Sequence, residues 1–210
     1  MSGCGCESKV EELVEQQNGE RRRTLWIVLG INAVMFVAEL AAGLLAESQA
    51  LIADSADNLG DTLVYAMSLF VVAKSIQWRA GAAFVKGLIQ LAFGIAIVAS
   101  IVNSLLGEPE PIGLVMMGVA AAALIGNLVC FVLLMKHRSE DVNMRSVWLC
   151  SRNDVIGNIG VIISGGLVML FNSPWPDLLV ASIVAIVFLH TSYAVLRDAI
   201  DVFRKGGADK

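Results

Sequence analysis

The chain has 210 residues, of which 57% are hydrophobic and 16% are charged, and it carries a formal net charge of −4. Soluble globular domains have a charged fraction of about 25%, so this balance excludes an ordinary soluble domain and indicates an integral membrane protein. We expect no nucleic-acid partner.

Six apolar runs follow one another along the chain, and each is long enough to form a helix across a bilayer core, which needs about 20 residues. We predict transmembrane helices at about residues 24–46, 49–73, 80–106, 112–135, 145–171 and 175–196, the last with an amphipathic extension to residue 203. No polar stretch is long enough for a separate soluble domain. We therefore expect an all-α polytopic membrane protein with a tail at 1–23, a six-helix domain at 24–203 and a short tail at 204–210.

The charges between the runs predict the orientation of the chain. Lys and Arg gather before the first run and after the second, fourth and sixth runs, whereas the opposite loops carry Glu47, Glu108, Glu110 and Asp177. Short cytoplasmic loops collect Lys and Arg. The first 23 residues are polar, so we expect no cleavable signal peptide. Both termini are therefore predicted to be cytoplasmic.

The second run contains a polar stripe. Its members are three, four or seven residues apart and share one helix face; they are Asp54, Asp57, Asn58 and Asp61. An aspartate at the centre of a membrane helix costs about 2.5 to 3.5 kcal/mol, so the stripe must face protein or water. Counted at about 1.5 Å per residue from Gln49, Asp57 and Asp61 lie roughly 12 and 18 Å deep, on either side of the midplane.

The fifth run carries a second polar cluster, in which Cys150, Asp154 and Asn158 are four residues apart on one face. Counted from Arg145, Asp154 lies roughly 14 Å deep, so two helices of opposite direction place carboxyl groups at one depth. Arg152 is two residues from Asp154, on roughly the opposite side of the helix. We expect its guanidinium to snorkel to the interface or to pair with another helix.

Carboxyl groups that converge in a medium of low dielectric repel one another when ionised, so protons or a bound cation must neutralise some of them. Asp57 and Asp61 form one i, i+4 pair. Cys150 and Asp154 form another, and four such ligands suit a tetrahedral ion such as Zn²⁺. One thiolate favours Zn²⁺ or Cd²⁺ over Mg²⁺ or Ca²⁺. The residues therefore predict a site that exchanges a divalent metal for protons.

Hydrogen bonding between helices is the alternative role for a polar residue in a membrane span. We expect that role for Asn32, Asn127 and Asn153. The sequence does not decide whether Lys86 and Gln90 serve the core or an interface.

Three cysteines lie outside the fifth run. Cys4 and Cys6 form a CxC pair near the N-terminus, which is a candidate site for soft-metal capture. A disulfide between them is not expected in a reducing compartment. We expect Cys130 to act as a small apolar residue.

Three longer stretches carry a further clue. The first two runs contain "INAVMFVAELAAGLLAESQALIADSADNLGD", the fifth contains "NDVIGNIGVIISG" and the sixth reads "WPDLLVASIVAIVFLHTSYAVLRDA". They resemble the first two, the fifth and the sixth helices of the cation diffusion facilitator, or cation efflux, family. The resemblance implies a homodimeric transporter that exports divalent metal, with Zn²⁺ or Cd²⁺ favoured, from the cytoplasm in exchange for protons. It also implies a bacterial inner membrane location, no enzymatic activity and no resident cofactor.

The resemblance assigns roles to individual residues. The metal ligands that it implies are Asp57, Asp61, Cys150 and Asp154. Glu39, Asp54 and Asn158 are assigned to proton relay or to the support of these ligands. Asn153 or Asn158 is the alternative fourth ligand, because family members usually have His or Asp where this chain has Cys150.

A second departure from the family pattern lies at the C-terminus. Most family members carry a soluble C-terminal domain, whereas this chain stops after "FRKGGADK". We expect that domain to be lacking, in which case dimerisation rests on the membrane helices.

Other functions would also use buried carboxyl groups. A proton-conducting or metal-sensing membrane protein without coupled transport is the main alternative. An intramembrane aspartyl protease would need a GxGD motif, and the text here is "NLGD", with Asn58 in place of the first Gly. The sequence therefore does not favour an enzyme.

Overall fold

The structure is a computed structural model that describes the backbone of residues 6–70, 76–107, 109–137 and 142–208. Within these ranges, the side chains of residues 6–18, 68, 76–77, 79, 142–147, 149–150 and 205–208 lie outside the description. The predicted capture site at Cys4 and Cys6 therefore lies outside the described residues.

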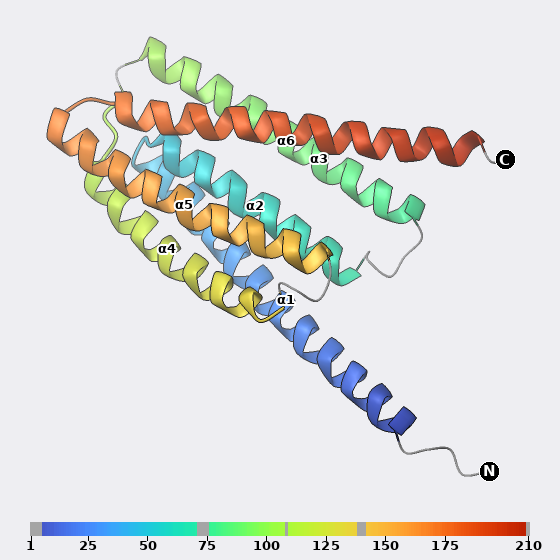
Figure 1. The fold of residues 1–210 in the computed structure, drawn as a ribbon. Helices are drawn as coiled ribbons and strands as arrows, with labels where there is room; N and C mark the ends of the chain where they lie inside the picture. The colour runs from blue at the N-terminus through green and yellow to red at the C-terminus, as the bar shows by residue number, and fades with distance from the viewer. Residues whose placement is uncertain (1–5, 71–75, 108, 138–141, 209–210) are drawn as a thin grey trace, which may run out of the picture.

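The described chain forms six α-helices, which confirms the prediction of an all-α fold (Figure 1). They are α1 (Cys6–Leu45), α2 (Gln49–Phe70), α3 (Ile76–Leu106), α4 (Gly113–Met135), α5 (Val142–Phe171) and α6 (Trp175–Ala208). The helices follow the predicted apolar runs, but several extend beyond them: α1 begins at Cys6, α3 begins at Ile76 and α6 ends at Ala208. The predicted boundary at residue 23 therefore falls inside one continuous helix.

Five of the described helices are long and apolar enough to cross a membrane, by length and composition alone. These stretches are Gly19–Leu45, Ala80–Leu106, Gly113–Met135, Ser151–Phe171 and Trp175–Arg204. The helix α2 does not meet this criterion, because Asp54, Asp57 and Asp61 interrupt its apolar sequence. The protein is thus a polytopic membrane protein whose second helix pairs membrane length with three carboxyl groups.

Helix packing explains how α2, with its three carboxyl groups, can lie within a bilayer. The closest helix pairs are α1 with α2, α3 with α6 and α4 with α5, and α2 also packs against α3, α5 and α6. In Figure 1 the pair of α3 and α6 lies along one side of the group formed by the other four helices. Residues of α2 contribute to all three apolar clusters of the described core, through Ala53, Leu51 and Tyr65 among others. Protein neighbours therefore replace lipid around α2.

Both chain ends lie at the same end of the bundle, and the turns that join α1 to α2, α3 to α4 and α5 to α6 lie at the other end (Figure 1). This arrangement agrees with an even number of membrane crossings. The side of the membrane on which the termini lie stays a prediction.

The N-terminus of α2 is held by the first turn of α6. The Asp177 carboxylate accepts hydrogen bonds from Ser48 Oγ at 2.6 Å and from the backbone N–H groups of Gln49 and Ala50 at 2.7 and 3.1 Å. The N–H of Leu51 donates to Ser48 Oγ at 3.1 Å. Asp177 of α6 and Ser48, the residue before α2, thus satisfy N–H groups that a helix start leaves without partners, and Asp177 fixes α2 against α6.

Candidate functional site

The polar stripe of α2 faces the protein interior. Asp54, Asn58 and Asp61 are 4%, 2% and 5% exposed, and Asp57 is half-buried. The burial follows from the spacing, because residues three and four apart lie on the side of α2 that meets its neighbouring helices. Two groups of contacts extend from this stripe, one toward α1 and one toward α5.

Asn58 connects the stripe to α1. Its Nδ2 donates to Glu39 Oε2 at 2.6 Å, and Glu39 is 1% exposed. The carboxyl groups of Glu39 and Asp54 also interact with each other. Glu39, Asp54 and Asn58 therefore form one connected cluster, which we call the acid–amide cluster.

Gly157 places α5 beside the acid–amide cluster. A Cβ atom added to Gly157 would lie 3.4 Å from Asp54 Oδ1, at ordinary van der Waals distance. Asp54 is therefore enclosed between α1 and α5. This enclosure explains why its charge can be stabilised only by groups of the protein, a proton or a cation.

The second group of contacts joins α2 to α5. The Asp154 carboxyl group, 4% exposed, interacts directly with that of Asp61, and its electrostatic neighbours include Asp57 and Asp54. Tyr65, one turn further along α2, donates its hydroxyl to Asp61 Oδ2 at 2.5 Å. A close approach of two buried carboxyl groups is favourable only when a proton or a cation is shared between them. Asp61 and Asp154 thus make a carboxyl pair suited to proton or cation binding.

Asn158 lies one turn beyond Asp154 and is fully buried. Its Nδ2 donates to the backbone oxygen of Asp154 at 2.9 Å, and its Oδ1 has no hydrogen-bond partner among the described residues. Asn158 is therefore placed to support Asp154, and its Oδ1 can still accept a hydrogen bond. The other predicted substitute ligand, Asn153, is exposed and accepts a hydrogen bond from Arg152 at 3.4 Å.

Two other sequence predictions concern α5. Arg152 is exposed, and the hydrogen bond that the structure gives it goes to Asn153 of its own helix. Cys150 belongs to α5 one turn before Asp154, but its side chain lies outside the described residues. Ligation by Cys150 therefore stays a prediction.

The carboxyl groups do not form a ready-made coordination sphere. Among the described side chains, no group of three or more His, Cys, Asp or Glu residues is arranged to hold a metal ion. Asp61 is engaged with Tyr65 and Asp154, whereas Asp57 is half-buried and has Asp61 as an electrostatic neighbour.

Cys130 lies closer to the carboxyl pair than the sequence indicated. Cys130 is fully buried on α4, and its Sγ accepts a hydrogen bond from Asn32 Nδ2 at 3.8 Å. Its electrostatic neighbours include Asp154 and Asp61. Both oxygen and nitrogen of the buried Asn127 side chain, one turn before Cys130, lack hydrogen-bond partners in the described structure. The i, i+3 spacing of Asn127 and Cys130 was the available signal for this polar edge of α4.

The fold and the site define an all-helical membrane protein in which α2 and α5 bring carboxyl groups together inside an apolar bundle. The family model for the cation efflux transmembrane domain matches residues 25–203, and the chain belongs to this family. The resemblance inferred from the sequence is thereby confirmed.

Named relatives fall in the same family. The metal cation efflux system protein CzcD of Cupriavidus metallidurans is 25% identical over 203 residues, which cover 91% of this chain and 64% of that protein. The zinc transporter ZitB of Escherichia coli is 27% identical over 205 residues, covering 90% and 64%. The cadmium, cobalt and zinc/H(+)-K(+) antiporter of Bacillus subtilis is 24% identical over 202 residues, covering 90% and 65%. The chain thus spans about two-thirds of the length of these relatives.

Proposed function

We propose that this protein exports divalent metal cations, with Zn²⁺ or Cd²⁺ favoured, from the cytoplasm in exchange for protons. The observation that carries the proposal is the contact between Asp61 on α2 and Asp154 on α5 inside the bundle. The relatives' names point in the same direction, since they refer to metal efflux, zinc transport and antiport with H⁺. A member of this family is a transporter, and we assign it no enzymatic activity.

The metal is the substrate, and its ligands in this proposal are Asp57, Asp61, Cys150 and Asp154. Carboxylates and a thiolate bind metal only when deprotonated, so metal and protons compete for the same groups. When the metal leaves, protons restore neutrality to the buried carboxyl groups. Exchange of one for the other is then a property of the site itself.

The acid–amide cluster is the proposed route for protons. Glu39 Oε1 and Asp54 Oδ2 are buried acceptor oxygens without hydrogen-bond partners among the described residues. Asp54 is one turn closer to the start of α2 than the ligand pair. A proton displaced from the ligands can therefore move along α2 to Asp54 and Glu39.

The membrane setting follows from the helix surfaces. Large apolar side chains such as Val34, Leu114 and Ile186 are 69%, 69% and 68% exposed on α1, α4 and α6. These faces suit contact with lipid or with a second copy of the chain. We propose an inner-membrane homodimer formed through transmembrane helices, with both termini in the cytoplasm.

The main alternative is proton conduction or metal sensing without coupled transport. It would use the same buried carboxyl groups, of which those of Asp61 and Asp154 interact directly. The two functions differ in what crosses the membrane.

Reconstituted vesicles distinguish the two. The protein should drive Zn²⁺ or Cd²⁺ across the membrane when a proton gradient is imposed, and added metal should in turn move protons. Protein-dependent proton flux that is the same with and without metal would support the alternative and overturn the proposal.

A further inference from the structure

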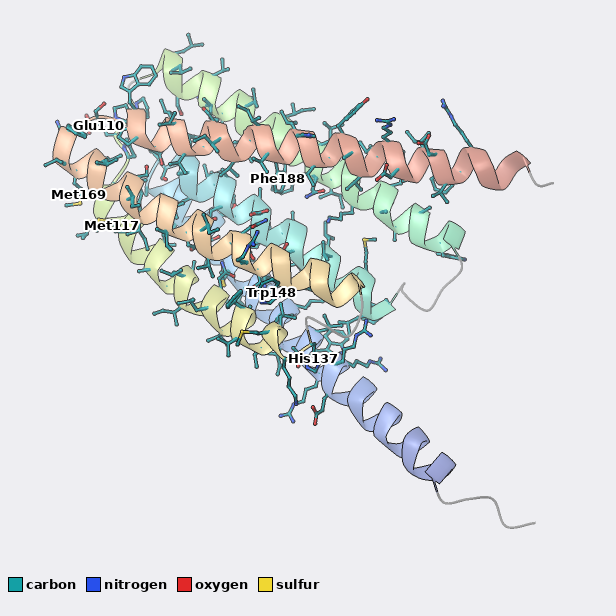
Figure 2. All side chains as sticks on the ribbon, in the orientation of Figure 1. Glu110, Met117, His137, Trp148, Met169 and Phe188 are labelled. Carbon is teal, nitrogen blue, oxygen red and sulfur yellow. The ribbon has the colours of Figure 1, made fainter. Side chains whose placement is uncertain are left out.

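A cavity of ≈ 300 Å³ lies at the end of the bundle that carries the turns, where α1 ends, α2 begins and α3 ends. We call it the turn-end cavity. Glu110, labelled in Figure 2, lies at this end of the bundle. The side chains with oxygen atoms that line the cavity are Glu47, Gln49, Ser100, Asn103 and Ser104. Among the described residues that line it there is no Lys, Arg or His. The lining therefore offers oxygen ligands and one carboxylate, without a basic side chain beside them.

Gln49, the first residue of α2, brings a buried acceptor to this cavity. It is 6% exposed, and its Oε1 has no hydrogen-bond partner among the described residues. Its backbone N–H donates to Asp177 Oδ2 at 2.7 Å, so the main chain at this residue is held in place. A buried amide oxygen without a partner is unfavourable, and such an atom usually meets a water molecule or an ion. Gln49 therefore indicates a ligand in the turn-end cavity.

Glu47 brings a carboxylate to the same cavity from the turn between α1 and α2. It is exposed, and its Oε2 accepts a hydrogen bond from the backbone N–H of Glu110 at 3.4 Å. An ionised carboxylate has two oxygens and can accept further contacts. An exposed carboxylate and a buried amide oxygen thus line one cavity, two residues apart in the chain.

The oxygen ligands determine which ion the cavity suits. Carboxylate, amide and hydroxyl oxygens suit hard cations such as Mg²⁺, Ca²⁺ and Mn²⁺, whereas thiolates select softer metals. The affinity of such sites falls with the number of charged ligands, and this cavity has one carboxylate. The turn-end cavity therefore suits a divalent cation that binds weakly and leaves easily.

The cavity lies along α2 from the proposed metal ligands. Gln49 precedes Asp57 by about two helical turns, a rise of roughly 12 Å. Ile52 lines the cavity and packs against an apolar cluster that includes Ala53 of α2 and Phe188 of α6. Phe188 is labelled further toward the middle of the bundle in Figure 2. A cation that moved from the acids toward the turns would therefore pass this cluster and then meet the oxygen atoms of the cavity.

We propose that the turn-end cavity is a low-affinity, all-oxygen site for a divalent cation, through which the exported metal leaves the protein. This inference rests on the proposed function and on the predicted orientation, which places the turns on the outer side. Weak binding suits this position, because a release site that bound metal tightly would retain it. A hard divalent cation in the outer solution would bind to the same oxygen atoms and compete with the departing metal.

Binding is tested with Mn²⁺, which suits oxygen ligands and is detected by electron paramagnetic resonance. The full chain carries Asp61→Asn and Asp154→Asn, so that the carboxyl pair of the proposed metal site is removed. This protein should bind Mn²⁺ with a Kd of roughly 10⁻⁴ to 10⁻³ M, the range of weak extracellular cation sites. In this background, Glu47→Gln, Gln49→Met and Asn103→Ala should each weaken Mn²⁺ binding by about tenfold, because each removes an oxygen ligand or its charge.

Glu110→Gln is the matched control. It removes an acid from the same end of the bundle and keeps the backbone N–H that Glu47 contacts, and Glu110 is not among the residues that line the turn-end cavity. Mn²⁺ binding should therefore be unchanged. Glu47 and Asn103 are exposed, so their variants serve if the buried Gln49→Met variant does not fold.

Zn²⁺ transport in vesicles gives a second readout, without the changes at Asp61 and Asp154. Mn²⁺ added on the side that receives the metal should slow Zn²⁺ transport by the wild type, because it occupies the release site. Glu47→Gln should need about tenfold more Mn²⁺ for the same inhibition, in proportion to its weaker binding. Glu110→Gln should be inhibited like the wild type.

The outcomes separate this inference from the proposed function. Mn²⁺ binding that is unchanged in the cavity variants, or weakened equally by Glu110→Gln, would overturn the inference even if the wild type transports Zn²⁺. Equal inhibition of the wild type and Glu47→Gln by Mn²⁺ would also overturn it. A wild type that binds Mn²⁺ as expected but moves no Zn²⁺ in exchange for protons would instead refute the proposed function.

Discussion

At the scale of single residues, Asp61 and Asp154 are the side chains on which the proposed exchange depends. They come from different helices, they are buried, and their carboxyl groups interact. Tyr65 fixes the orientation of Asp61 through the hydroxyl hydrogen bond at 2.5 Å. The pair therefore combines burial inside a membrane span, which is energetically unfavourable for ionisable groups, with a defined geometry. This combination indicates a functional role rather than a packing role.

The first prediction concerns this pair. Asp61→Asn and Asp154→Asn should reduce Zn²⁺ transport by more than the roughly 10- to 100-fold that loss of a supporting residue costs, because each removes a charged ligand while keeping its shape. Transport into vesicles with an imposed proton gradient is the measurement. Asp198→Asn, an exposed acid on α6, is the control. Normal transport by both variants of the pair would refute the site.

Glu39 allows metal binding to be separated from proton movement. Glu39→Gln retains an oxygen that can accept the hydrogen bond from Asn58 Nδ2, but its amide group cannot carry a titratable proton. We expect Zn²⁺ binding close to that of wild type and proton-driven transport reduced by about tenfold or more. Calorimetry and vesicle transport measure the two quantities on the same preparation. An equal loss of both would show that Glu39 only supports the metal ligands.

At the scale of helices, α2 depends on a cap that comes from α6. Asp177→Ala should lower stability by about 0.5 to 2 kcal/mol, the usual cost of losing an N-terminal cap, because N–H groups of Gln49 and Ala50 lose their acceptor. Thermal unfolding in detergent measures the loss, and amide hydrogen exchange should rise in the first turn of α2. Asp201→Ala, exposed near the end of α6, should change neither quantity. Unchanged exchange at Gln49 and Ala50 would show that the cap is dispensable.

The helices and the buried acids of α2 and α5 could be predicted from the sequence, for a physical reason. Apolar runs long enough to span a bilayer can be recognised without knowing which helices pack together. The same holds for acids such as Asp61 and Asp154 inside them. Helical spacing also grouped Asn58 with its neighbours on α2. These features depend on one helix at a time.

The sequence could not show which neighbouring helix or side chain each helix face contacts. Asp177 reads as an acid at the start of a helix, and only packing shows that it caps α2. Tyr65 reads as an ordinary residue of a membrane helix until its hydroxyl is found on Asp61. Lys86 and Gln90 were undecided for the same reason, since spacing shows which residues share a face but not which helix that face meets.

At the scale of the whole molecule, the arrangement of helices and the distribution of charge make one joint prediction. Both chain ends lie at one end of the bundle, and the basic residues gather on the same side of the predicted spans. Because short cytoplasmic loops collect Lys and Arg, we expect both termini in the cytoplasm and the turns at 46–48 and 172–174 on the outer side. Single cysteines introduced at Glu47 and Asn172, in a variant lacking the native cysteines, should react with a membrane-impermeant thiol reagent in intact cells. A cysteine introduced at Arg22 should react only after the membrane is permeabilised. Labelling of the Arg22 position in intact cells would show that the chain has the opposite orientation. The proposed exchange would then move metal in the opposite direction.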